Sequence, residues 1–147
     1  MSIEFTIRHA THNDWLELLR LLKSCHLPID DLRPENASHF LVAEHSGKII
    51  GSIGHEPYEE IGLLRSLAVG PENRRHGIGA ALIQAMKKLC KQSGVTSTFI
   101  LTTTAETFAK HHGFSNVPRE SVPLAIQHTD QFRSLCPSSA VCLSLAI

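Results

Sequence analysis

Hydrophobic and polar positions alternate in some stretches of this chain and recur at helical spacing in others. Residues 3–8 (Ile-Glu-Phe-Thr-Ile-Arg) alternate between apolar and polar side chains, which is the period of a half-buried strand. Thr11 and Asp14 resemble a helix start, and apolar residues three or four positions apart then predict a helix over 12–24. Residues 27–34 show no clear period, so we expect an irregular or weakly helical connection there.

The middle of the chain has the pattern of consecutive strands. Residues 40–43 and 49–53 are strand-like, and the sequence Ser-Gly-Lys at 46–48 predicts a hairpin turn between them. A third strand is expected over 60–69, and a polar loop containing glycine follows Pro71. These elements favour a sheet with antiparallel neighbours.

A long amphipathic helix is expected after this loop, and Gly94 ends it at a C-cap position. The apolar face of this helix consists of Leu82, Ile83, Met86, Leu89 and Cys90. Residues 98–102 are typical of a buried strand, 104–111 predict a short helix, and 140–145 predict a closing strand. The pattern therefore predicts an α/β (α+β) fold in one domain over 1–147, with a mixed sheet and helices on both faces.

Length and composition exclude several classes of function. The 147 residues fit one domain, and 14 Lys+Arg balance 14 Asp+Glu, which argues against a nucleic-acid binder. No stretch approaches the ~20 apolar residues that span a bilayer, and the N-terminus lacks the basic start of a secretory signal. We expect a cytoplasmic protein that binds neither nucleic acid nor membrane.

The cysteines match no metal-binding pattern, because Cys25, Cys90, Cys136 and Cys142 lie 65, 46 and 6 positions apart. Without an export signal they are expected to be reduced thiols. Cys136 and Cys142 suggest a metalloid site as an alternative, since thiolates are soft ligands. Two thiols are a weak ligand set, however, and Cys142 lies in a hydrophobic run. We therefore expect no metal.

Residues 67–82 (Leu-Ala-Val-Gly-Pro-Glu-Asn-Arg-Arg-His-Gly-Ile-Gly-Ala-Ala-Leu) carry the strongest chemical signal. A strand leads through Arg-x-x-Gly-x-Gly directly into a helix, whose N-terminus offers unpaired N–H groups and a positive dipole end to an anion. Arg74, Arg75 and His76 add positive charge for phosphates. The string is neither a P-loop nor a dinucleotide fingerprint. The alternative to a phosphate site is an exposed turn that uses glycine for its geometry and arginine for its solubility.

This string resembles the acetyl-CoA pyrophosphate motif of the GNAT (Gcn5-related) N-acetyltransferase superfamily. The order and spacing of the other elements agree over essentially the whole chain, including the segment from Ala105 to Gly113 and Phe114. The resemblance implies a mixed, mostly antiparallel twisted sheet, splayed at its centre between residues 67–69 and the strand at 98–102. It also implies that acetyl-CoA is the co-substrate, with its thioester in the notch of the splay, and that no metal takes part.

In that family, backbone amides hold the pyrophosphate and the splayed strand pairs with the pantetheine arm. The implied cofactor-binding residues are Leu67, Ala68, Val69, Arg74, Arg75, His76, Gly77, Ile78, Gly79, Ala80 and Thr104. A backbone N–H near Leu67 is the implied oxyanion donor. Ala109 stands where many members have a tyrosine that protonates the leaving thiolate, and the chain's only tyrosine is Tyr58.

A general base is expected just upstream of the same strand, where His55, Glu56, Glu59 and Glu60 lie. We favour Glu56 as the catalytic residue, acting directly or through water, with His55 as the next candidate. The alternative is that this acidic cluster is a solvated hairpin end. Strand parity does not decide which side chains face the site, because the family usually has a β-bulge here.

Three arginines are candidates for recognising an anionic substrate. Arg65 interrupts an apolar strand, and a buried arginine is costly unless it is paired or faces a polar cavity. Arg33 lies on the early connection, and Arg119 precedes Pro123. Together they predict a pocket for a small acidic amine. The alternative for Arg65 is a structural pair with an acidic side chain.

A second resemblance refines the expected substrate. Residues 119–123 and 131–140, together with 64–69 and 101–105, resemble the GNAT subgroup encoded in bacterial arsenic-resistance operons. That subgroup is associated with acetylation of amino-acid-like amines such as organoarsenical or phosphinate antibiotics. The final segment is also similar to N-acetylglutamate synthases.

We therefore expect an N-acetyltransferase that moves acetyl from acetyl-CoA to a small acidic amino acid or an amino-acid-like toxin. The alternatives are a non-catalytic acyl-CoA-binding sensor, prompted by the missing tyrosine, and an N-acetyltransferase for glutamate or another metabolic amino acid. The expected partner is a small-molecule amine, and a homodimer is the candidate assembly.

Overall fold

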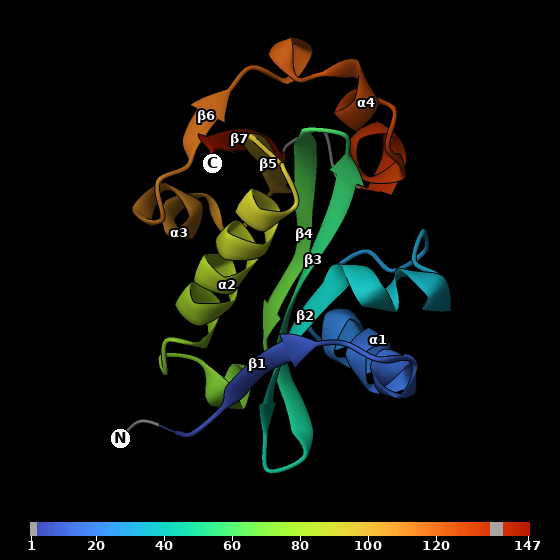
Figure 1. Ribbon diagram of the computed structural model, residues 1–147, viewed down its shortest axis with the longest axis vertical. Helices are drawn as coiled ribbons and strands as arrows, with labels where there is room; N and C mark the ends of the chain where they lie inside the picture. The colour runs from blue at the N-terminus through green and yellow to red at the C-terminus, as the bar shows by residue number, and fades with distance from the viewer. Residues whose placement is uncertain (1–2, 136–139) are drawn as a thin grey trace.

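The computed structural model describes residues 3–135 and 140–147. Strands in these ranges form one sheet in the order β1-β2-β3-β4-β5-β7-β6 (Figure 1). Their bounds are β1 Thr6–His9, β2 Phe40–His45, β3 Lys48–Tyr58, β4 Ile61–Val69, β5 Ser97–Thr102, β6 Ser115–Val117 and β7 Val141–Ala146. β4 and β5 are parallel and the other neighbouring strands are antiparallel, which confirms the mixed, mostly antiparallel sheet.

The first three helices follow the predicted order, and a fourth short helix lies where the sequence predicted none. Their bounds are α1 Trp15–Ser24, α2 Ile78–Gln92, α3 Glu106–His111 and α4 Leu124–Gln127. A 3-10 turn over His12–Asp14 precedes α1, and the Asp14 carboxylate accepts the Thr11 backbone N–H at 2.7 Å, as the sequence indicated. Another 3-10 helix, Pro34–His39, begins at the end of the stretch for which the sequence predicted an irregular or weakly helical connection. Among the described residues no helix is long and apolar enough to cross a membrane.

Helices cover both faces of the sheet, and the alternation of side chains along β2 shows why. Phe40 and Val42 pack with α1 on one face, whereas Leu41 and Ala43 pack with α2 on the other. A third apolar cluster surrounds Ile126 of α4 and includes Leu63, Leu101 and Cys142. Leu63 points away from its neighbour Leu64, which belongs to the α2 cluster, so the α4 cluster shares the face covered by α1.

The sheet splays between β4 and β5, as the family resemblance implied. Their pairing runs from Ile61 and Ser97 to Leu64 and Ile100. β4 then continues to Val69 alongside β3, while β5 continues alongside β7. Among the described residues, the edge of β4 that faces β5 therefore has no strand partner beyond Leu64. The Val69 carbonyl on this stretch accepts Arg74 Nε at 3.1 Å, and the remaining edge can pair with a ligand that lies in the notch.

A β-bulge in β4 lies at the same place. Gly54 pairs with Arg65 and Ser52 with Ala68, so two residues of β4 lie opposite one of β3. Ser66, in the bulge, has a φ of +56°, and its carbonyl accepts the Ser52 hydroxyl at 2.8 Å. Because the bulge follows Arg65, successive side chains from the hairpin turn to Arg65 point alternately to the two faces of the sheet.

Candidate active site

The loop between β4 and α2 turns sharply at two residues with left-handed backbone. Arg75 has a φ of +70°, and Gly77, the N-cap of α2, has a φ of +77°. No side chain in ranges 3–135 and 140–147 caps the helix, and its first turn contains no acidic residue, so its N–H groups and positive dipole end stay available to an anion. This geometry supports the predicted phosphate site.

A cavity of about 390 Å³ lies at this helix N-terminus, and we call it the loop cavity. Its wall consists of Cys25, Leu67, Ala68, Val69, Asn73, Arg74, Arg75, Gly77, Ile78, Gly79, Ala80, Ala105 and Phe108. The predicted cofactor residues thus come together here, except His76, which does not line the cavity, and Thr104. Arginines and free amides beside an apolar wall suit a ligand that has both phosphates and an aliphatic arm.

The predicted cofactor set lacks four residues of this wall, namely Cys25, Asn73, Ala105 and Phe108. Cys25 follows α1 and lies against β4, where its thiol is 3.8 Å from the Val69 carbonyl oxygen. Phe108 of α3 packs so closely on Gly79 that a Cβ there would be 3.2 Å from the ring. Asn73 belongs to the predicted string and was overlooked, whereas no local pattern connects Cys25 or Phe108 with the loop.

A second cavity of about 300 Å³, the notch cavity, lies where β4 and β5 separate. It shares Leu67 and Ala105 with the loop cavity, and it shares Arg65 with a third cavity described below. Thr104, one of the implied cofactor-binding residues, lines the notch cavity. Three adjoining cavities therefore follow β4 from the helix N-terminus to Arg65.

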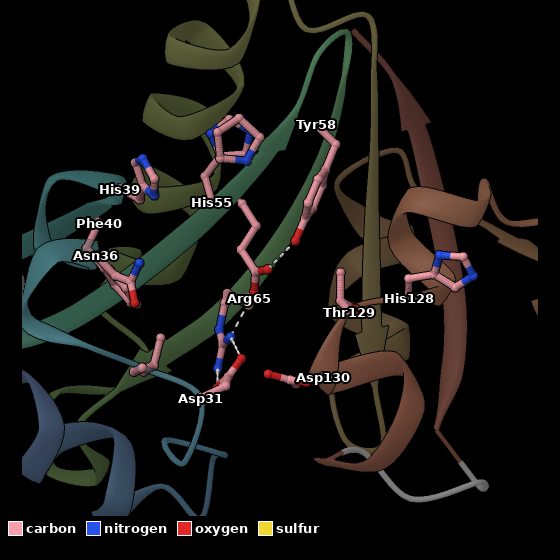
Figure 2. Close-up of a pocket in the computed structure, with 13 residues that line it drawn as sticks. Asp31, Asn36, His39, Phe40, His55, Tyr58, Arg65, His128, Thr129 and Asp130 are labelled. Carbon is pink, nitrogen blue, oxygen red and sulfur yellow. Dashed lines mark hydrogen bonds and ion pairs between the residues drawn. The ribbon is translucent and has the colours of Figure 1, made fainter.

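The third cavity, of about 410 Å³, is the carboxylate cavity (Figure 2). It lies between the connection after α1 and the segment after α4. Its lining residues are Asp31, Leu32, Asn36, His39, Phe40, His55, Glu56, Pro57, Tyr58, Arg65, His128, Thr129 and Asp130. This cavity lies on the face of the sheet that α1 covers. Leu64 points into the α2 core, so the adjacent residue Arg65 points to the opposite face.

Arg65 is fully engaged inside the protein. Its Nη1 donates to Asp31 and to Glu56 Oε2 (2.8 Å), and its Nη2 donates to Asp31 Oδ1 (2.9 Å) and the Pro28 carbonyl (3.2 Å). Its Nε donates to the Ser66 hydroxyl at 3.1 Å. A guanidinium has five N–H donors, and each of them has a partner here. The geometry favours the structural pairing of Arg65 over its use as a fork for a substrate anion.

Glu56 and His55 point to opposite faces of β3, which resolves the question that parity left open. Glu56 lies opposite Leu63 and faces Arg65, and its Oε1 accepts the Tyr58 hydroxyl at 2.6 Å. His55 lies opposite Leu64, and its ring packs over Gly62 on the α2 face. A Cβ added to Gly62 would lie 2.5 Å from His55 Nε2. Burial, with Glu56 as hydrogen-bond acceptor, raises the pKa of Tyr58. Of the two catalytic candidates, only Glu56 directs its side chain into the ion-pair cluster.

His55 is 7% exposed, and its Nε2 has no hydrogen-bond partner within the described part of the chain. Burial, helped by His39, lowers its pKa below the ordinary 6.5. The folded state therefore binds this proton less readily than the unfolded state, and stability falls as the pH drops below about 6.5.

We expect His55→Phe, which keeps an aromatic ring and removes the titratable group, to weaken this pH dependence. Between pH 7 and pH 5 the free energy of unfolding of the wild type should fall by about 1 kcal/mol more than that of the variant. Urea unfolding at both pH values measures this difference. An equal loss in both proteins would show that His55 does not contribute.

The three arginines do not converge on one pocket. Arg33 is exposed beside the 3-10 helix Pro34–His39 and does not line the carboxylate cavity. Arg119 donates to the carbonyls of Ala140 (2.9 Å) and Phe132 (3.4 Å), and its guanidinium stacks 4.6 Å from the Phe132 ring centre. Only Arg65 of the three reaches the cavity, because Arg119 is used to hold the C-terminal segment.

The cysteines give no support to a metalloid site. Cys90 and Cys142 are buried free thiols, and burial raises the pKa of each to about 11. Cys136, the other proposed ligand, lies outside the described residues. Within the described ranges no group of three or more His, Cys, Asp or Glu side chains is placed to hold a metal ion.

Comparisons with known proteins agree with this geometry. Residues 36–116 match the family model of the acetyltransferase (GNAT) domain. An amino-acid acetyltransferase of Mycobacterium tuberculosis is 32% identical over 101 residues, 66% of this chain and 56% of that protein. An uncharacterized N-acetyltransferase of Chlorobaculum tepidum is 30% identical over 114 residues, 77% of this chain and 71% of that protein. The chain thus spans little more than half of the first relative.

Solved structures share the fold. N-acetylglutamate synthase from Neisseria gonorrhoeae, complexed with coenzyme A and N-acetyl-glutamate, has a TM-score of 0.85 at 18% identity, over 99% of this chain and 36% of that chain. A Mycobacterium tuberculosis protein complexed with coenzyme A has a TM-score of 0.81 at 22% identity, over 97% of this chain and 99% of that chain. The splayed sheet described above is therefore the fold of known acetyltransferases.

Proposed function

The chain belongs to the GNAT acetyltransferase family, and on that premise we propose that it transfers acetyl from acetyl-CoA to the amine of a small, amino-acid-like acceptor. The observation that carries the proposal is the series of cavities along the splayed β4. One end has the amides and arginines that suit phosphates, and the other has a carboxylate that suits an amine. The amino-acid-like acceptor is suggested by relatives that are amino-acid acetyltransferases.

In the proposed complex the co-substrate lies along the loop cavity and the notch. The amides from Arg75 to Ala80 receive the pyrophosphate, and the free edge of Leu67–Val69 pairs with the pantetheine arm. Acetyl-CoA supplies an activated thioester when bound. A backbone N–H near Leu67, which lines the notch, is the proposed donor that stabilises negative charge on the carbonyl oxygen.

Glu56 is the proposed proton acceptor for the attacking amine. Arg65 and Tyr58 hold its carboxylate in place, and its side chain is 26% exposed, so a ligand in the cavity can reach it. The amine nitrogen forms a bond to the acetyl carbon and gives its proton to Glu56, the carbon–sulfur bond breaks, and the coenzyme A thiolate leaves. A thiolate leaves readily, so the alanine at position 109 in place of the family tyrosine does not prevent the reaction.

An acceptor with extra acidic groups, such as an organoarsenical or phosphinate amino acid, was the finer expectation from the sequence. It came from the resemblance to the arsenic-resistance subgroup and from three arginines, of which only Arg65 reaches the cavity, with its donors already occupied. Acidic acceptors, glutamate included, therefore stay as alternatives for an acceptor screen.

Thiol release from acetyl-CoA, measured with a panel of acidic, neutral and basic amines, tests the proposed function. We expect release that depends on both acetyl-CoA and an amine, with the acetylated product identified by mass spectrometry. Tight binding of acetyl-CoA without turnover on any amine would instead favour the acyl-CoA sensor. Faster reaction with peptides than with free amines would indicate a protein acetyltransferase.

A further inference from the structure

We propose that His26 is the proton donor to the coenzyme A thiolate that leaves when acetyl is transferred. This inference rests on the proposed function and deepens it, because it names a residue for the second half of the reaction. Three observations support it: the location of His26 at the border of two cavities, the backbone that holds it there, and the chemistry of the other described residues that line the notch cavity.

His26 lies where the proposed path of acetyl-CoA passes from the loop cavity into the notch cavity. Cys25 lines the loop cavity, and the next residue, His26, lines the notch cavity. Leu67 and Ala105 line both cavities and so mark the same border. The thioester is proposed to lie in the notch near Leu67, which brings its sulfur to the part of the path that His26 lines.

The backbone of His26 has a left-handed conformation, in which glycine is the usual residue. Its φ is +60°, and it follows the C-cap of α1. The His26 N–H donates to the Lys23 carbonyl at 3.0 Å. The Leu27 N–H reaches back to the Leu22 carbonyl, also at 3.0 Å, which completes the Schellman ending of a helix. A histidine in place of glycine costs stability here, and residues held in such conformations cluster at active sites.

Two contacts hold the segment around His26 against β4. On one side of it, the Cys25 thiol lies 3.8 Å from the Val69 carbonyl oxygen. On the other side, the Pro28 carbonyl accepts Arg65 Nη2 at 3.2 Å. With the other described residues the His26 imidazole forms no hydrogen bond or ion pair, and His26 is exposed. The backbone is therefore fixed, while the ring is free to meet a ligand and to exchange protons with water.

The notch cavity offers few proton donors to a leaving sulfur. Among the described residues that line it, only His26 and Arg65 have titratable side chains. A guanidinium does not give up its proton in proteins, and the N–H groups of Arg65 already have acceptors. An imidazole is the side chain that most often transfers protons in catalysis. The other polar side chains can only hydrogen-bond a thiolate, and they are those of Ser66, Thr102, Thr103, Thr104 and Gln131.

The proposed step balances protons and charge. The amine nitrogen bonds to the acetyl carbon and gives its proton to Glu56, and the carbon–sulfur bond breaks with its electron pair on sulfur. The imidazolium form of His26 donates a proton to this thiolate, which leaves as the neutral thiol, and His26 becomes a neutral imidazole. Negative charge on sulfur is thereby removed beside apolar residues such as Ile100 and Leu101, which solvate it poorly. Water then returns a proton to His26 and takes one from Glu56.

His26→Asn and His26→Gly test the proposal, because both new residues adopt a positive φ readily. With the best amine of the acceptor screen, we expect each variant to lower kcat for thiol release at least about tenfold. The Kd of coenzyme A should change less than about threefold, because the phosphate site is intact. His12→Asn is the matched control, since His12 is exposed and lines none of the three cavities, and its kcat should stay within about twofold of the wild type.

Chemical rescue separates proton donation from a structural role. Glycine removes the side chain and leaves room for free imidazole at the edge of the notch. Added imidazole should therefore raise the kcat of His26→Gly at least about threefold, and it should leave the wild type and His12→Asn unchanged. Thermal melting should show that His26→Gly is at least as stable as the wild type, because glycine is favoured at this helix ending.

The outcomes distinguish this inference from the proposed function. Variants of His26 that retain more than a tenth of the wild-type kcat would overturn its role and leave acetyl transfer intact. A fall in kcat that imidazole does not restore would also overturn it, and so would a change confined to the Kd of coenzyme A. Binding of acetyl-CoA by the wild type without turnover on any amine would overturn the proposed function, and the role of His26 with it.

Discussion

Gly77→Asp is expected to weaken acetyl-CoA binding by at least about a hundredfold while the protein remains folded. Gly77 is the N-cap of α2, and a Cβ built there meets no atom within 4 Å, so the new side chain has room. Asp is a favourable N-cap residue, and among L-residues it tolerates a φ of +77° comparatively well. The expected cost in stability is about 1 kcal/mol.

The loss of binding has an electrostatic cause. A carboxylate about 5 Å from a phosphate, at an effective dielectric constant of about 20, costs about 3 kcal/mol, which is roughly a hundredfold in Kd. Isothermal titration with coenzyme A measures the loss, and thermal melting checks the fold. Gly77→Asn is the matched control, because asparagine has the same shape as aspartate and must adopt the same positive φ, but it carries no charge. If the two variants bind coenzyme A equally well, phosphates do not lie at this helix N-terminus.

The loop was predictable because its chemistry is local. Strand, turn, arginines, glycines and helix are consecutive in the sequence, so a single string indicates both the backbone geometry and the charge. The structure places nearly all of the predicted residues around one cavity. Cys25 was not predictable, because it reaches the same wall from the end of α1, over a separation of 44 residues from Val69.

The acceptor side depends on contacts that sequence patterns do not encode. The partner of Arg65, Asp31, lies 34 positions away on an irregular connection with no periodicity to indicate its direction. Arg119 has the same chemistry as Arg65, but backbone carbonyls of the C-terminal segment occupy it. A count of arginines therefore predicted an acidic substrate, whereas the folded chain pairs or diverts these charges.

The choice between His55 and Glu56 depended on the position of one bulge. Side chains alternate from the hairpin turn, so Tyr58 and Glu56 share the face of Arg65, and His55 takes the other. A bulge before Arg65 would have exchanged these faces. The bulge lies at Ser66, beyond Arg65, and the family resemblance alone did not specify that position.

Glu56→Gln is expected to lower kcat about a hundredfold or more, with little change in the Kd of acetyl-CoA. The amide has nearly the shape of the carboxylate and still accepts the Tyr58 hydroxyl, but it takes no proton from the amine at neutral pH. Removing a positioned general base costs about 10²–10⁴-fold in rate. Binding of acetyl-CoA should persist, because Glu56 does not line the loop cavity or the notch.

Glu60→Gln is the control for this variant. Glu60 is exposed at the hairpin turn and lines none of the three cavities, so its loss of charge should leave kcat within about twofold. Steady-state thiol release at saturating acetyl-CoA gives kcat for both variants, and calorimetric titration gives Kd. Retention of more than a tenth of the wild-type kcat by Glu56→Gln would exclude Glu56 as the base. The proton would then pass to water in the notch, and the Arg65–Glu56–Tyr58 cluster would serve to shape the acceptor cavity, a role that moves KM and acceptor preference rather than kcat.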